Sequence, residues 1–340
     1  MMLARRIAVL AASTFTLAAA QFAGDAVAQQ QFTMKLSTAS LNDVNHEFMK
    51  ALKTGVESRS GGKIKVEIYP ASQLGPMVRT IEGVAVGTVE MDFPPVSFLV
   101  GMDRRYVVFD VPGLFDSIEH GHRALADPDI RKRVATLGAA RGVESLFVAL
   151  SGPLMMLSHK PVHTVADFKG QKIRVPGGTP LQIEPLKKLG VSPVTMSPSE
   201  MMPAMQNRAI DGFYTGFPIL TAFKYYDVAK GATQLPGSFL MLTALVNRNF
   251  MKSLGTDLEA MVREEARKAE RLYTTFGVED VARIRATWEK NGGQFIQMAP
   301  AEARRYIQEV TSALPPILAG EPQLKEDYDA YLAAANKYRK

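Results

Sequence analysis

The chain contains no cysteine, and only one tryptophan and five histidines occur among its 340 residues. The absence of cysteine excludes a disulfide-stabilised scaffold, cysteine-ligated zinc or iron–sulfur sites, and a thiol nucleophile. An apolar fraction of 46% beside a charged fraction of 22% excludes a disordered or collagen-like chain and is typical of a soluble globular protein. The length leaves two lobes or one large α/β domain as the possible organisations.

The common catalytic motifs are missing as well. No glycine-rich dinucleotide or phosphate loop, no H-E-x-x-H zinc motif and no G-x-S-x-G nucleophile motif occurs. Glu119, His120 and His122 come nearest to a metal-binding cluster, but His120 and His122 do not share a helical face. The sequence therefore predicts no enzymatic activity, no cofactor and no metal site.

Charge points to small anions rather than to nucleic acid. The formal net charge is +6 at pH 7, yet the densest basic run, Arg131-Lys132-Arg133, is short and has no interleaved aromatic residues. A nucleic-acid partner is therefore not expected. A mildly basic surface instead favours encounter with small anionic ligands.

The N-terminal segment predicts export. Arg5 and Arg6 precede an uncharged stretch from Ile7 to Ala20, and Ala26-Val27-Ala28 provides small residues where a signal peptidase cleaves. The stretch is shorter than the ~20 residues of a membrane-spanning helix, and no later segment approaches that length. We expect residues 1–28 to be a signal peptide cleaved after Ala28, which would place the mature protein in the periplasm.

Strand and helix patterns alternate along the rest of the chain. Apolar residues alternate at Phe32–Leu36 and Ile64–Ile68, and they recur at helical spacing between Val44 and Val56. Helices are also expected after Thr179, as N-cap, and from Ser199. Further strands are predicted at 89–93, 146–150, 172–175, 191–196 and 240–247. This order is typical of βαβ units and predicts an α/β fold with parallel strand pairs.

Two features predict a division into lobes. Ser151-Gly152-Pro153 interrupts the pattern where the chain is expected to leave a first lobe, and the strand at 240–247 is expected to return to it. Thr256 and Glu259 are predicted to cap a helix whose 3.6-residue repeat continues to Glu289, which is long enough to bridge both lobes. The predicted boundaries are 29–151 and 240–280 for lobe 1, and 152–239 and 281–335 for lobe 2.

Arg174 is the residue with the clearest binding chemistry. It stands between Ile173 and Val175 in a predicted strand that Pro176-Gly177-Gly178 follows at once. In open α/β sheets ligands bind beyond the carboxyl ends of strands, and a guanidinium offers planar, bidentate donors to a carboxylate. A salt bridge at the surface or between lobes is the alternative that the residues alone leave open.

Four segments in register resemble the extracytoplasmic solute receptors of TRAP transporters. They include Asp110-Val111-Pro112-Gly113-Leu114-Phe115 and Ala209-Ile210-Asp211-Gly212, and the match covers essentially the whole mature chain. The other two are 62–70 with Gln73-Leu74-Gly75, and 167–176, which contains Arg174. The resemblance implies two α/β lobes, a long helix spanning both, and a carboxylate-bearing solute clamped between them, with Arg174 as the carboxylate-binding residue.

The chain departs from the sialic-acid-binding members of that family at two positions. Those members carry a second arginine where this chain has Leu154, and they continue the Asp-Gly pair with Gln-Glu-Asn, whereas Phe213-Tyr214-Thr215 follows here. An unpaired buried polar group costs about 1–3 kcal/mol, so these changes disfavour a heavily hydroxylated sugar acid. They indicate a smaller or more hydrophobic carboxylate, including an aromatic one.

The sequence thus predicts a periplasmic receptor that binds a small organic anion by lobe closure and delivers it to TRAP membrane subunits. The aromatic residues near Arg174 either line the site or pack beneath it. Two alternatives remain: a receptor that reports the solute to a sensor, and a secreted hydrolase or lyase using Asp211 or Glu200. The predicted ligand-binding residues are Arg174, Tyr214, Phe213, Thr215, Phe217, Thr38, Phe93 and Ser151.

Overall fold

The computed structural model describes residues 31–175, 178–196 and 198–339. The predicted signal peptide lies outside the described residues, as do Pro176 and Gly177. The strands are β1 (Phe32–Ser37), β2 (Ile64–Tyr69), β3 (Met91–Asp92), β4 (Val143–Ser158), β5 (Lys172–Val175), β6 (Ser192–Thr195), β7 (Gly212–Gly216), β8 (Gly231–Asn247) and β9 (Gln294–Ile296).

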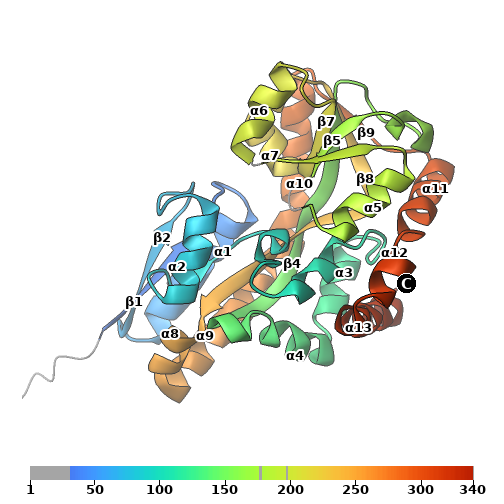
Figure 1. The fold of residues 1–340 in the computed structure, drawn as a ribbon. Coiled ribbons are helices and arrows are strands. Elements are labelled where there is room, and N and C mark those ends of the chain that lie inside the picture. Colours follow the sequence, from blue (N-terminus) through green and yellow to red (C-terminus); the bar gives the residue numbers. More distant parts are fainter. Residues whose placement is uncertain (1–30, 176–177, 197, 340) are drawn as a thin grey trace, which may run out of the picture.

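Helices cover the sheet on both sides (Figure 1). The α-helices are α1 (Val44–Arg59), α2 (Met77–Val86), α3 (Ile118–Leu125), α4 (Pro128–Thr136), α5 (Pro180–Lys188), α6 (Pro198–Gln206), α7 (Phe217–Ala222), α8 (Arg248–Ser253), α9 (Gly255–Glu270), α10 (Leu272–Lys290), α11 (Pro300–Thr311), α12 (Leu314–Ala319) and α13 (Pro322–Tyr338). The 3-10 helices are η1 (Val96–Leu99), η2 (Arg104–Asp110), η3 (Ala139–Arg141), η4 (Val165–Phe168) and η5 (Tyr225–Asp227).

Within the described residues, the strands form one sheet in the order β2-β1-β3-β8-β4-β7-β5-β6, with β9 paired to β8. The pairs β1–β2, β1–β3, β5–β6 and β5–β7 are parallel, whereas β3–β8, β8–β4 and β4–β7 are antiparallel. Each end of the sheet is therefore a βαβ array, as the sequence predicts. Strands β2, β1 and β3 form the first array, and strands β7, β5 and β6 form the second. The long strands β4 and β8 join the two arrays and run between them (Figure 1).

The crossing between the arrays differs from the sequence prediction in one respect. Ser151-Gly152-Pro153 does not end a strand, because β4 continues through it from Val143 to Ser158. The segment instead coincides with shifts of the β4–β8 register next to Gly152 and Pro153. A proline and a glycine produce a local irregularity here without stopping the strand, because the partner strand β8 is equally long and continues alongside it.

The predicted bridging helix is present, with two corrections. The helical path from Gly255 to Lys290 is divided into α9 and α10 at Arg271, whose angles of φ −59° and ψ −23° remain helical. Its N-terminus is not capped by Thr256 and Glu259, because the helix begins at Gly255 without a side-chain cap. Helix α10 contacts α1 at one end of the sheet and α7 and β9 at the other, so it spans both arrays.

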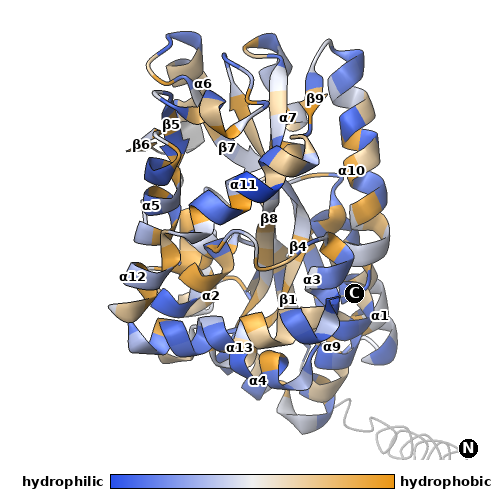
Figure 2. Ribbon diagram, turned by 90° about the vertical axis from the view of Figure 1, so that its right-hand side faces the viewer, coloured by the Kyte–Doolittle hydropathy of each residue, from blue (hydrophilic) through white to orange (hydrophobic). Residues whose placement is uncertain are grey.

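The core lies along the central strands. In Figure 2 apolar residues follow β4 and β8 through the middle of the molecule, while outer helices such as α13 carry hydrophilic residues. Four buried clusters surround the sheet, two centred on residues of the first array and two on the second. Among the described residues, no helix is both long and apolar enough to span a bilayer.

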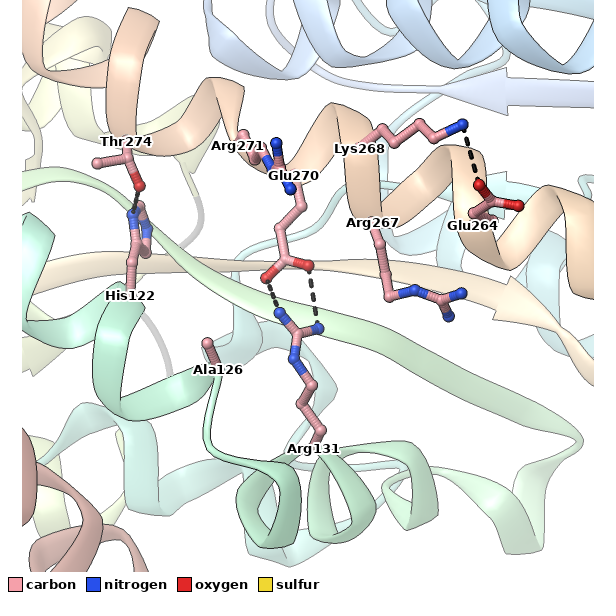
Figure 3. A pocket seen from close by; sticks show the side chains of 9 residues that line it. All are labelled: His122, Ala126, Arg131, Glu264, Arg267, Lys268, Glu270, Arg271 and Thr274. Atoms are coloured by element: carbon pink, nitrogen blue, oxygen red, sulfur yellow. Dashed lines mark hydrogen bonds and ion pairs between the residues drawn. The ribbon is translucent and has the colours of Figure 1, made fainter.

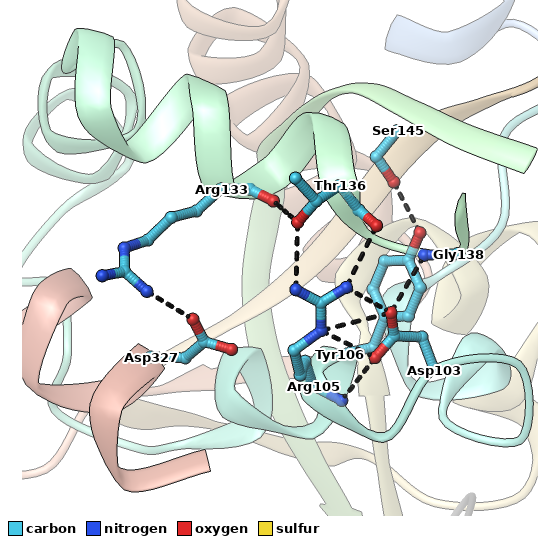
Figure 4. Close-up of polar contacts among 8 residues, drawn as sticks. All are labelled: Asp103, Arg105, Tyr106, Arg133, Thr136, Gly138, Ser145 and Asp327. Carbon is cyan, nitrogen blue, oxygen red and sulfur yellow. Dashed lines mark hydrogen bonds and ion pairs between the residues drawn. The ribbon is translucent and has the colours of Figure 1, made fainter. Parts of the chain in front are cut away.

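The C-terminal helix packs on the first array. Helix α13 contacts α3, α4 and η2, and Arg133 donates to Asp327 of α13 at 2.9 Å (Figure 4). Beside this pair, Arg105 binds both Asp103 and the hydroxyl and carbonyl of Thr136, which holds η2 against α4. Residues 322–338 therefore contact the segment that the sequence assigns to lobe 1, and the lobe boundaries themselves stay a prediction.

A buried carboxyl in the first array makes stability depend on pH. Asp92 at the end of β3 is 2% exposed and accepts a hydrogen bond from Thr80 at 2.7 Å. Burial raises the pKa of Asp92 to about 6, so the folded protein holds a proton that the unfolded chain releases above pH ~4. The unfolding free energy is therefore expected to fall between pH ~4 and ~6, by up to about 3 kcal/mol from this group.

Asp92→Asn keeps an acceptor for Thr80 and cannot ionise, so we expect it to remove this part of the pH dependence. Chemical denaturation of both proteins at pH 4, 5, 6 and 7 measures the difference. The exposed Asp129→Asn serves as the control for loss of a carboxylate. Parallel pH profiles for wild type and Asp92→Asn would contradict the expectation.

Candidate ligand-binding site

Arg174 lies near the carboxyl end of β5, a short strand held between two parallel neighbours. Its register partners are Val194 on β6 and Phe213 on β7. The alternation that places Ile173 and Val175 in the core turns Arg174 to the other face of the sheet. Arg174 therefore lies one residue before the carboxyl end of its strand, where the sequence predicts it.

The guanidinium of Arg174 is buried without an acidic partner. The residue is only 4% exposed, and its Nε donates to the carbonyl oxygen of Met196 at 3.0 Å. Among the described residues, Arg174 makes no ion pair and no other hydrogen bond. Burial lowers the pKa of Arg174, but a guanidinium stays charged at neutral pH, so this site holds a buried positive charge that lacks a counter-ion.

Tyr214 is a predicted site residue that remains partly accessible and lies within electrostatic reach of Arg174. Burial raises the pKa of its hydroxyl well above the ordinary value; the charge of Asp110 raises it further and that of Arg174 opposes the shift. No described residue hydrogen-bonds to this hydroxyl. Tyr214 thus lies within electrostatic reach of both Arg174 and Asp110, although the strand register turns it to the face of Ile173 and Val175.

Asp110, at the end of η2, reaches toward α5 from the other array. Its Oδ2 accepts a hydrogen bond from the Gln182 amide at 3.0 Å. Burial raises the pKa of Asp110 to about 7 despite this bond, so the carboxyl is close to half protonated at neutral pH. The pair connects the two predicted lobes near Tyr214.

The turn between β5 and α5 carries a second polar group without a partner. Thr179 occupies the N-cap position that the sequence predicts, but its hydroxyl makes no capping bond. Its Oγ1 is buried and has no hydrogen-bond partner among the residues that the structure describes. Gly178 before it has φ +65°, a conformation that favours glycine. A buried guanidinium with one hydrogen bond and a buried hydroxyl with none among the described residues thus lie on one strand-turn-helix unit, where a ligand would supply the missing partners.

Three of the other predicted site residues carry hydroxyl groups, and the remaining three are phenylalanines. Thr215 is partly exposed on β7, and Ser151 donates to the carbonyl of Leu240 at 3.3 Å where β4 crosses between the arrays. Thr38 is 1% exposed, and its hydroxyl is within 3.1 Å of the Ser40 hydroxyl. These three lie along the strand ends and the crossing.

The three phenylalanines predicted as ligand walls are buried in the cores. Phe213 packs on Tyr225 with ring centroids 4.8 Å apart, Phe217 packs on Trp288, and Phe93 packs on Phe48. Their exposed fractions are 0%, 0% and 2%. The register with β5 turns Phe213 to the face of the sheet that Arg174 occupies and Tyr214 to the opposite face, with Ile173 and Val175.

Sequence reasoning missed Tyr225, Asp110 and the Met196 carbonyl. Tyr225 is 3% exposed and is close enough to Arg174 for each to affect the other's pKa. Met196 contributes a backbone atom, which side-chain identity does not reveal. Asp110 was visible within the Asp-Val-Pro-Gly-Leu-Phe segment, but nothing in that pattern indicated contact with a residue 72 positions away.

Residues considered for catalysis or metal binding have structural partners. Asp211 accepts from the backbone N–H of Lys172 at 2.7 Å, which fixes the start of β5. His120 bonds the carbonyl of Ala335, and His122 bonds Thr274 and the backbone of Leu150. The described part of the chain contains no group of three or more His, Cys, Asp or Glu residues placed to hold a metal ion.

Two βαβ arrays are joined by a pair of long antiparallel strands and a bridging helix, and a buried arginine without an acidic partner among the described residues lies at one strand end. The chain belongs to the family described as bacterial extracellular solute-binding protein, family 7, whose sequence profile matches residues 36–319. The resemblance to TRAP solute receptors is thereby confirmed.

Relatives support this assignment along most of the chain. The 2,3-diketo-L-gulonate-binding periplasmic protein YiaO of Escherichia coli is 25% identical over 271 residues, which cover 79% of this chain and 82% of YiaO. The C4-dicarboxylate-binding periplasmic protein DctP of Vibrio cholerae is 26% identical over 254 residues, 74% of each chain.

Solved structures show the same fold. A TRAP periplasmic solute-binding protein from Desulfovibrio salexigens with bound orotic acid has a TM-score of 0.83 at 21% identity, covering 91% of this chain and all of the other. A TRAP protein from Shewanella oneidensis with bound succinate has a TM-score of 0.80 at 22% identity, covering 90% and 99%. The predicted two-lobed fold is confirmed.

Proposed function

We propose that this chain is the periplasmic receptor of a TRAP transporter that captures an organic carboxylate, closes around it and delivers it to membrane subunits. The chain performs no chemistry on the solute. Its first 28 residues act as the export signal, with cleavage after Ala28.

The observation that carries this proposal is the uncompensated guanidinium of Arg174. A buried charge without a counter-ion is costly, and a carboxylate ligand would supply both the charge and the missing acceptors. The relatives named above are described as binding 2,3-diketo-L-gulonate and C4-dicarboxylates, and the two structures contain orotic acid and succinate. All four of these solutes carry a carboxylate.

Closure follows from contact with both lobes. A solute held by Arg174 on the second array and by strand-end residues such as Thr38 on the first binds fully only when the lobes are shut. A shift from 1:99 to 99:1 in favour of the closed form requires about 5.5 kcal/mol of preferential binding. The hydrogen bond between Asp110 and Gln182 already joins the two predicted lobes, and it can persist when they close.

The side chains at positions 154 and 214 favour a compact, weakly hydroxylated acid. Leu154 and Tyr214 lie on the same face of the β4–β7 pair and pack against one buried cluster. Neither residue offers the amide or guanidinium donors that sialic-acid-binding members carry at these positions. The flat ring of Tyr214 suits an aromatic or short aliphatic carboxylate, and its hydroxyl supplies one hydrogen bond.

A thermal-shift screen against a library of organic acids tests the function. A ligand that binds only the folded protein raises the melting temperature by mass action. We expect at least one small or aromatic carboxylate to stabilise the protein and its neutral amide to leave the melting temperature unchanged. Stabilisation by neutral sugars or amines, with no response to acids, would contradict the proposal.

The same library tests the selectivity. We expect N-acetylneuraminate to bind more weakly than the best simple acid, by about 5–150-fold, because its hydroxyl and amide groups would be buried without partners. Calorimetric titration of both ligands gives the ratio. Tighter binding of the sialic acid would show that Leu154 and Tyr214 do not set the specificity.

A further inference from the structure

A cavity of about 530 Å³ lies in the first array, between helices α3 and α4 on one side and α9 and α10 on the other (Figure 3). Arg174 and the other residues of the proposed solute site are not among its lining residues. A neighbouring cavity of about 140 Å³ shares Arg131 and Arg267 with it. The larger cavity is lined by His122, Ala126, Arg131, Glu264, Arg267, Lys268, Glu270, Arg271 and Thr274.

The lining is positively charged. Four of its side chains are cationic and two are carboxylates, which leaves a net charge of +2 if His122 is neutral. His122 is neutral at pH 7 because burial lowers its pKa to about 4, and its ring bonds Thr274 and the backbone of Leu150. The cavity therefore has a fixed excess of positive charge throughout the neutral range.

Both carboxylates of the cavity are already paired. Glu270 accepts two parallel hydrogen bonds from Arg131, each 3.0 Å long. Glu264 binds Lys268 at 3.0 Å and Arg59 at 2.9 Å. Neither is left to neutralise a further cation.

Arg267 and Arg271 are the two cations that remain. Neither side chain makes a hydrogen bond or an ion pair with any described residue, although Arg267 is close enough to oppose the rise in the pKa of Glu270 that burial causes, and no dashed line reaches either arginine in Figure 3. They are four residues apart on a continuous helical path, which places their Cβ atoms about 5–6 Å from each other on one helix face. Both side chains line the cavity, and each guanidinium has donors that no described residue uses.

Helix stabilisation alone does not explain this arrangement. Basic residues in the last turn of a helix interact favourably with its dipole, but α9 continues into α10 and has no free end near Arg267. Arg271 lies at the junction with α10, where the helical path continues and no free helix terminus is present. An interaction with the helix dipole also does not explain why a cavity lies beside both arginines.

We propose that this cavity is a second anion site, separate from the solute site, which takes a phosphate dianion or a phosphate monoester. A phosphate group carries about −1.5 to −2 charges at pH 7, which balances the excess in the lining, and its oxygens accept bidentate bonds from guanidinium groups. The same chemistry comes from a free phosphate compound or from a phospholipid headgroup.

Titration calorimetry with inorganic phosphate, in a buffer free of phosphate and sulfate, tests the site. We expect Arg267→Gln/Arg271→Gln to weaken phosphate binding at least about tenfold, because both donors are lost. The control Arg141→Gln/Arg304→Gln removes two other exposed arginines that have no partner among the described residues, so it should bind phosphate as wild type does.

Vesicle sedimentation distinguishes the two sources of phosphate. Vesicles containing phosphatidate should retain wild-type protein more than phosphatidylcholine vesicles if a headgroup is the natural ligand, and the Arg267→Gln/Arg271→Gln variant should lose that retention. Binding of inorganic phosphate without retention by phosphatidate assigns the site to a free phosphate compound. The proposal is overturned if neither inorganic phosphate nor phosphatidate vesicles bind at millimolar concentration. It is also overturned if Arg267→Gln/Arg271→Gln and Arg141→Gln/Arg304→Gln weaken phosphate binding equally.

Discussion

Replacement of Arg174 by alanine is expected to abolish the binding of organic acids while the fold stays intact. Each charge-assisted hydrogen bond to the carboxylate is worth about 1.5–3 kcal/mol, so the loss of two corresponds to a roughly 100-fold or greater fall in affinity. The side chain forms no described ion pair whose loss would unfold the protein. Calorimetric titration with the best acid from the screen measures the change.

Two further variants sharpen this prediction. Arg174→Lys keeps the charge but cannot present two parallel donors, so it should bind more weakly than wild type and more tightly than Arg174→Ala. Arg304→Ala on α11 removes an exposed arginine without a described partner and should bind the acid normally. Unchanged affinity in Arg174→Ala would remove this residue from the site.

Gly212→Ala should destabilise the protein strongly and weaken solute binding with it. A Cβ at position 212 would lie 2.3 Å from the carbonyl oxygen of Leu157 and 2.9 Å from Cβ of Ser158, so β7 would have to move away from β4. Overpacking of this kind costs about 1–3 kcal/mol, and the upper half of that range is expected because one obstacle is backbone. Gly212 also pairs with Ile173, so the shift would displace the strand that carries Arg174.

Chemical denaturation and calorimetry of Gly212→Ala and Gly101→Ala provide the comparison. A Cβ at Gly101 meets no atom within 4 Å, so the control adds the same methyl group in open space. Equal stability of the two variants would show that the close approach of β7 to β4 is not a constraint.

Most of the fold could be predicted because local pattern and topology agree. Alternation at β1 and β2 and the 3.6-residue repeat of α1 give these elements within about three residues of their observed ends. The continuity of β4 could not be predicted, because Gly152 and Pro153 are local breakers. Only pairing with β8, about ninety residues later in the chain, keeps them in the strand.

The candidate site was predictable only in part, for a geometric reason. Arg174 stands out because a charged residue interrupts an apolar strand. The sequence does not tell how β7 is registered against β5, so it does not show that Phe213 shares a face of the sheet with Arg174 while Tyr214 lies on the other face. Contacts such as Asp110–Gln182 join segments that no periodic pattern relates.

A thermodynamic cycle tests the central claim most directly. Wild type and Arg174→Ala are each titrated with the best acid and with its primary amide, which has nearly the same shape but no charge. The account predicts that the acid is preferred by about 100-fold or more in wild type and that the preference nearly vanishes in Arg174→Ala. The same preference in both proteins would contradict the claim that Arg174 holds the carboxylate of the solute.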